Sequence, residues 1–181
     1  MKSTRRALLA SLLIALSAVA GQALASIPNV ELVTFLVFLS GYLLGPRFGA
    51  FVGGAAMGAH SLFNVMGSVV PPMLVTQIIA YAAIGAAGGT LGVAISRISN
   101  GVVVSILAGA TGATLVLAYQ FVINVAAYFT FTSTASLWTF IVGGIAFSAV
   151  QISWNAAVFF AALRPTTAVL SRFRDELNGT T

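Results

Sequence analysis

The chain has 181 residues, of which 59% are apolar and only 6% are charged. In soluble domains about a quarter of the residues are charged. The few charges of this chain could not cover a water-exposed surface, and lipid is therefore the expected solvent. The absence of cysteine excludes disulfides, thiolate metal sites and cysteine nucleophiles. The net charge of +5 would favour nucleic acid in a soluble protein, but here the basic residues lie at the ends of apolar runs. No nucleic acid partner is therefore expected.

The apolar residues form six segments separated by polar, glycine or proline residues. Continuous apolar runs favour helices over the alternating strands of a membrane barrel. Most runs reach the roughly 20 residues that cross a hydrocarbon core, and the second is short. The sequence thus predicts one all-α domain over residues 1–181, an integral membrane bundle of six transmembrane helices. The expected spans are about 7–25, 30–44, 48–66, 73–95, 102–128 and 137–163, with helix ends at Gly45-Pro46-Arg47 and at Arg164-Pro165.

The arginines predict the orientation. All eight Lys and Arg residues fall in the segments 1–6, 45–48, 96–101 and the tail after Leu163, and none falls in the alternate connections. Because basic residues bias loops to the cytoplasm, both termini are expected there. The expected location is a multi-pass position in a bacterial or archaeal plasma membrane.

The first segment permits two interpretations. Its basic start, apolar stretch and Ala23-Leu24-Ala25-Ser26 ending are also typical of a cleaved signal peptide, which would leave five spans in the same orientation. The small residues Ala7, Ser11 and Ala15 recur at i, i+4 spacing, which favours a retained helix that packs on another helix. Similar small-residue spacings, such as Gly49 with Gly53 and Gly85 with Gly89, predict close helix packing within the bundle or against a partner.

Polar side chains inside a membrane are functional candidates by default. The predicted spans bring amides and tyrosines toward the outer half, below loops without positive charge, which indicates a pocket for a neutral or polar organic solute. Gln151 and Asn155 lie deeper and are expected to bond a neighbouring helix, and so is His60; Trp138 is expected to anchor at the interface. The candidate solute-binding residues are Asn29, Glu31, Asn64, Gln77, Tyr81, Gln120, Asn124 and Tyr128. Replacement of Gln120 or Asn124 is expected to weaken binding more than replacement of Gln151.

Catalysis and cofactors are not expected. No serine–histidine–acid set, H-E-x-x-H or paired aspartate occurs, and one histidine without clustered acids makes no metal site. No G-x-x-x-x-G-K-[ST] loop occurs, so the chain does not hydrolyse ATP alone and solute movement would need an energising partner.

Six short spans and the stretch Ile27-Pro28-Asn29-Val30-Glu31-Leu32-Val33, followed by Gly45-Pro46-Arg47-Phe48-Gly49-Ala50, resemble the substrate-binding S components of energy-coupling factor (ECF) transporters. The resemblance implies capture of a vitamin or related micronutrient on the outer face. Uptake would need a transmembrane T component and two ATPase subunits. The family often has Ala-x-x-x-Ala on its first span for docking to the T component, and here Ala7, Ser11 and Ala15 are the nearest match.

Two other functions stay open at this stage. A membrane scaffold or cell-envelope assembly factor would use the polar faces only for interhelical bonds and would bind no ligand. An intramembrane enzyme would need a catalytic set that the sequence does not provide.

Overall fold

The computed structural model describes residues 2–63, 69–131, 134 and 136–178, with side chains for 4–63, 69–131, 134 and 136–174. Every described element is helical, so the predicted all-α bundle is confirmed. The elements are α1 (Lys2–Ala23), α2 (Val33–Leu44), α3 (Pro46–Leu62), α4 (Pro71–Ala87), η1 (Gly88–Gly92), α5 (Val93–Ser96), α6 (Gly101–Phe131), α7 (Leu137–Phe147) and α8 (Ala149–Asn178).

Three helical runs in the described part of the chain are long and apolar enough to cross a membrane: Thr4–Ala23, Pro71–Ser96 and Gly101–Phe131. The bent pair α7–α8 would make a fourth. The second run joins α4, η1 and α5 into one continuous helix, whose π-helical turn at Gly88–Gly92 places a wider backbone turn against α2. The apolar runs that predict these spans therefore correspond to helices with ends within a few residues of the expected ones.

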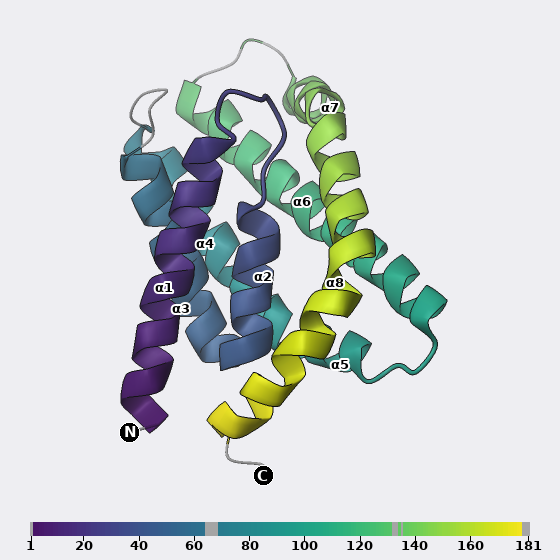
Figure 1. Cartoon of the computed structure of the whole chain (residues 1–181). Helices are drawn as coiled ribbons and strands as arrows, with labels where there is room; N and C mark the ends of the chain where they lie inside the picture. The colour runs from purple at the N-terminus through teal and green to yellow at the C-terminus, as the bar shows by residue number, and fades with distance from the viewer. Residues whose placement is uncertain (1, 64–68, 132–133, 135, 179–181) are drawn as a thin grey trace.

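Helix α2 forms the centre of the bundle (Figure 1). It has 12 residues, of which 11 are buried, and its length of about 18 Å is short of the roughly 30 Å hydrocarbon core. A helix that is hydrophobic on all sides is a core element. Helix α2 ends where Gly45 adopts φ +90°, a conformation that favours glycine, and Pro46 then starts α3 at its first position. The predicted stop at Gly45-Pro46 is confirmed.

Glycines allow α2, α3 and the α4–η1 run to touch backbone to backbone. A Cβ on Gly85 would overlap the backbone of Gly49, and one on Gly88 would overlap the Phe38 carbonyl. A Cβ on Gly53 would likewise overlap the Tyr81 carbonyl. These predicted small-residue stripes therefore serve internal packing, which supplies helix association where no hydrophobic drive exists between helices in lipid.

The sixth segment differs from the single span expected over 137–163. It is two helices, α7 and α8, bent by 49° at Ser148, where the Ser148 amide donates to both Gly144 and Ile145 carbonyls. Helix α8 also continues through Pro165 to Asn178 instead of ending at Arg164-Pro165. A proline removes one backbone donor but lets the helix resume, and the Thr167 hydroxyl donates to the Leu163 and Arg164 carbonyls beside it.

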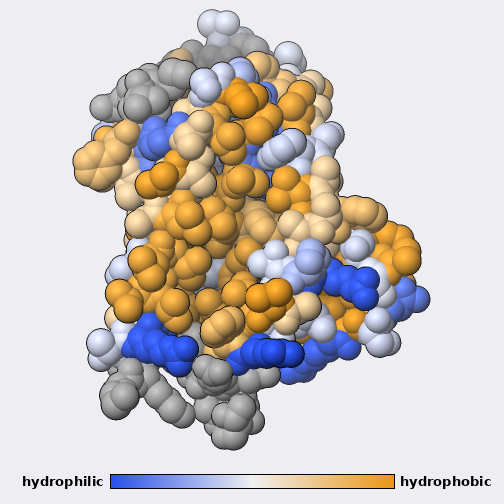
Figure 2. Space-filling model, viewed as in Figure 1, coloured by the Kyte–Doolittle hydropathy of each residue, from blue (hydrophilic) through white to orange (hydrophobic). Residues whose placement is uncertain are grey.

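The two ends of the bundle differ in charge. The chain termini lie at the same end, and the connection between α1 and α2 lies at the other (Figure 1). Strongly hydrophilic residues gather at the end with the termini, below a broad apolar band (Figure 2). Helix α1 exposes Leu8, Leu12 and Val19, which would face lipid if this helix lies in a membrane.

Candidate functional site

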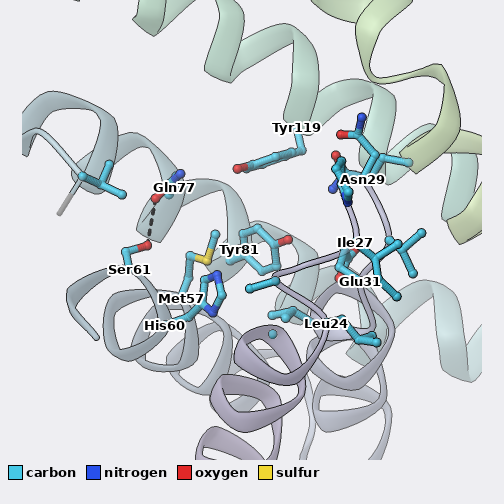
Figure 3. Close-up of a pocket in the computed structure, with 17 residues that line it drawn as sticks. Leu24, Ile27, Asn29, Glu31, Met57, His60, Ser61, Gln77, Tyr81 and Tyr119 are labelled. Carbon is cyan, nitrogen blue, oxygen red and sulfur yellow. Dashed lines mark hydrogen bonds between the residues drawn. The ribbon is translucent and has the colours of Figure 1, made fainter. Parts of the chain in front are cut away.

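A cavity of about 280 Å³ lies at the end of the bundle opposite the termini. We call it the loop cavity, because its wall includes residues of the roof loop (residues 24–32), which joins α1 to α2. The remaining wall comes from α1, α3, α4, α6 and α8, and Val33 at the start of the short helix α2 forms part of the lining. Among the lining side chains, Asn29 and Glu31 lie on the side opposite Gln77 and Ser61 (Figure 3).

The roof loop is fixed to the α7–α8 region by three hydrogen bonds, one of which is made by the Glu31 carboxylate. The Asn29 side chain donates from Nδ2 to the Phe147 carbonyl over 3.2 Å, and Trp154 donates from Nε1 to the Glu31 carbonyl over 2.8 Å. Asn29 has φ +63°, in the left-handed region that asparagine tolerates better than most residues. The loop therefore has a defined path beside the cavity.

Glu31 is the only acid among the described residues that line the cavity. Its Oε2 accepts the Thr34 amide over 2.9 Å, which caps the first turn of α2. Its Oε1 accepts Asn155 Nδ2 over 2.7 Å, a bond that ties the roof loop to α8. Each carboxylate oxygen retains capacity for a further hydrogen bond, so Glu31 is positioned both to support the fold and to meet a ligand.

The opposite wall carries hydroxyl and amide groups. Ser61 donates to Gln77 Oε1 over 2.8 Å, and the Tyr119 hydroxyl points toward Gln77 (Figure 3). The Tyr81 hydroxyl pairs with Thr34 Oγ1 over 3.2 Å. The Tyr81 and Tyr119 rings meet edge to face with centroids 5.3 Å apart. This wall offers aromatic surface and hydrogen-bonding groups to one small molecule.

His60 contacts the cavity and also joins α3 to α1. Gln22 Nε2 lies 3.3 Å from His60 Nδ1 and donates to the His60 carbonyl over 3.0 Å. Since an amide nitrogen only donates, Nδ1 accepts and the ring proton is assigned to Nε2. The predicted interhelical bond of His60 is confirmed. No group of three metal-ligating side chains occurs in the part of the chain that the structure describes.

The structure describes seven of the eight predicted binding residues and separates them into three groups. Asn29, Glu31, Gln77 and Tyr81 line the loop cavity together. Gln120 lies one layer behind it and donates to Gln151 Oε1 over 2.6 Å. Asn124 and Tyr128 face α7, because Asn124 packs on Gly144 and the Tyr128 ring meets Phe140. Asn64 lies outside the described residues.

Several lining residues are absent from the sequence-based prediction, above all Tyr119, Ser61 and Gln151. Tyr119 precedes Gln120, and adjacent residues of a helix face about 100° apart. The predicted residues 120, 124 and 128 therefore lie on the face of α6 next to the one that carries Tyr119. Gln151 bonds a neighbouring helix as expected, through Gln120 of α6, whereas Asn155 bonds Glu31 of the roof loop. Gln151 lines the loop cavity, whereas Asn124 does not.

The predicted docking stripe is exposed on α1. Ala7, Ser11 and Ala15 all face outward, beside the exposed Leu8 and Leu12. The Ser11 hydroxyl donates to the Ala7 carbonyl over 3.1 Å, so it needs no partner from outside the helix. A smooth, small-residue surface of this kind permits close approach of another membrane helix.

No protein-family model matches the chain, and comparisons with curated proteins and with solved structures found no significant match.

Proposed function

We propose that this chain is the solute-binding membrane subunit of an ECF-type importer. In this proposal six helical passes cross a prokaryotic plasma membrane, with both termini in the cytoplasm. The chain captures a vitamin-like solute in the loop cavity from the outer side. The observation that carries the proposal is a cavity with polar groups in its wall at one end of an apolar bundle, opposite the end where strongly hydrophilic residues gather (Figure 2).

The lining groups favour a class of solute. No Lys or Arg is among the described residues that line the cavity, whereas Glu31 is. An anion held about 5 Å from that carboxylate would be repelled by about 3 kcal/mol at an effective dielectric constant near 20. The aromatic edge of Tyr81 and Tyr119 and the Gln77 and Gln151 amides favour a small ring that donates and accepts hydrogen bonds. A neutral or cationic polar ring compound is therefore the proposed solute.

Movement of the solute requires other subunits. The sequence contains no phosphate-binding glycine loop, so ATP hydrolysis belongs to two ATPase subunits that act through a transmembrane T component. The exposed stripe Ala7, Ser11 and Ala15 is the proposed docking surface for that T component.

The test is to purify the full chain in mild detergent and identify co-purifying small molecules by mass spectrometry. The identified compound is then titrated calorimetrically without ATP. We expect one polar, non-anionic compound bound at a ratio of one per chain. An empty protein that binds no member of a vitamin panel would contradict the proposal and favour the alternative, a membrane scaffold or envelope assembly factor.

A further inference from the structure

A second hollow, of about 320 Å³, lies near the end with the termini. We call it the arginine hollow, because Arg97, Arg164 and Arg174 all contribute to its lining. These arginines come from the connection after α5 and from two turns of α8, so distant parts of the sequence converge there. Hydroxyl-bearing residues complete the polar lining: Ser96, Ser99, Thr167 and Ser171.

The electrostatics of the arginine hollow favour an anion. No acid is among the lining residues that the structure describes. The Arg164 guanidinium packs against Gly101, the first residue of the 31-residue helix α6, so the positive end of the helix dipole adds to the same potential. The Arg97 and Arg164 guanidinium groups around one concave space repel each other, and an anion between them relieves that repulsion.

The base of the hollow is fixed. Arg174 lies over the Tyr42 ring, 5.0 Å from its centroid, and the Tyr42 hydroxyl donates to the Thr167 carbonyl over 3.2 Å. Tyr42 is 1% exposed, so the ring that supports Arg174 belongs to the core. The Arg174 guanidinium is thereby held against the core instead of moving freely in solvent.

Exposed apolar side chains lie near these arginines in the sequence. Val102, Phe160 and Val169 are 69%, 50% and 64% exposed. Val102 adjoins Gly101, and Phe160 lies one helical turn before Arg164. A cationic hollow beside exposed apolar surface suits an amphiphile whose anionic head enters the hollow while its acyl chains lie on the helices.

We propose that the arginine hollow binds the phosphate headgroup of an anionic membrane phospholipid. This inference does not depend on solute capture at the loop cavity. It rests on the convergence of three arginines, the helix start at Gly101 and the adjoining apolar surface.

The experiment is native mass spectrometry of the full chain in detergent, titrated with phosphatidylglycerol or with phosphatidylcholine. The wild type is expected to retain phosphatidylglycerol more tightly. The double variant Arg97→Gln/Arg164→Gln should lose about thirtyfold in phosphatidylglycerol affinity, since each basic residue at an anionic surface contributes about a factor of five. Arg172→Gln is the matched control, because it removes one charge from α8 outside the hollow, and it should change affinity less than the single variant Arg164→Gln.

Further measurements distinguish binding of a lipid from binding of free phosphate, and distinguish a loss of binding from a loss of folding. Inorganic phosphate at millimolar concentration should not displace the lipid, whereas displacement of the lipid by phosphate alone would overturn the lipid assignment. Arg164→Lys keeps the charge and should retain part of the affinity, and each variant's thermal unfolding in detergent should match the wild type. Equal losses in Arg172→Gln and Arg164→Gln, or no preference for phosphatidylglycerol, would also overturn the proposal.

Discussion

The loop cavity and the arginine hollow are similar in volume, about 280 and 320 Å³, but opposite in electrostatic character. The loop cavity has Glu31 and amides in its wall and no described Lys or Arg, whereas the arginine hollow has three arginines and no described acid. Between them lies the glycine-packed contact of α2, α3 and α4. The two ends of this bundle therefore differ in the charge of their hollows more than in their size.

The sharpest test of the contrast is the side of the membrane on which each end lies. Because the chain has no cysteine, Ser26→Cys in the roof loop and Ser99→Cys in the lining of the arginine hollow introduce single labels at exposed positions. In intact cells, a membrane-impermeant maleimide should label Ser26→Cys and leave Ser99→Cys unlabelled until the cells are permeabilised. The reverse pattern would show the opposite orientation and place the loop cavity in the cytoplasm.

The glycine contact between the two ends should be the most sensitive part of the fold. Gly85→Ala introduces a Cβ that overlaps the Gly49 backbone, so the helices must separate and the unfolding free energy should fall by about 3 kcal/mol. Denaturation in mixed micelles measures this loss. Gly143→Ala is the control, because nothing lies within 4 Å of the added Cβ, and it should leave stability unchanged or raise it by up to about 1 kcal/mol. Equal effects would refute the close-packing account.

At the loop cavity, Glu31→Gln should lower both stability and solute binding. The new amide nitrogen would face either the Thr34 amide or Asn155 Nδ2, a donor against a donor, so the unfolding free energy should fall by about 2 kcal/mol. Affinity for a cationic solute should fall much more than affinity for a neutral one, which calorimetry would separate. Ser26→Ala in the same loop is the control, and a Glu31→Gln protein with wild-type stability and binding would contradict the role of the carboxylate.

The smallest expected effect concerns the attachment of the roof loop. Trp154→Phe removes the donor to the Glu31 carbonyl and should cost about 1 kcal/mol. Hydrogen exchange of the loop amides should accelerate by roughly fivefold as the loop opens more often. Trp138→Phe, on the 71% exposed Trp138 of α7, should leave the exchange unchanged; identical rates in both variants would mean that Trp154 does not hold the loop.

The sequence predicts the helices well, because long apolar runs and the Gly45-Pro46 stop are strong local signals. It does not predict the bend at Ser148 or the passage of α8 through Pro165, which depend on packing between distant segments. At the site, the sequence predicts four lining residues because they are polar and lie near the same end of the predicted spans: Asn29, Glu31, Gln77 and Tyr81. The selection of Asn124 and Tyr128 over Tyr119 reflects the rotation of α6 about its axis, and only its contacts with α4, α7 and α8 determine that rotation.

The most direct test of solute capture compares two substitutions of amides by leucine. Gln77→Leu removes the acceptor of the Ser61 hydroxyl from the cavity wall. Once the solute is identified, its dissociation constant from this variant should be about tenfold higher than from the wild type. Asn124 lies on the face toward α7, so the dissociation constant of Asn124→Leu should stay within about twofold of the wild-type value. Thermal unfolding must show that both variants are folded. A larger loss in Asn124→Leu than in Gln77→Leu would contradict binding in the loop cavity.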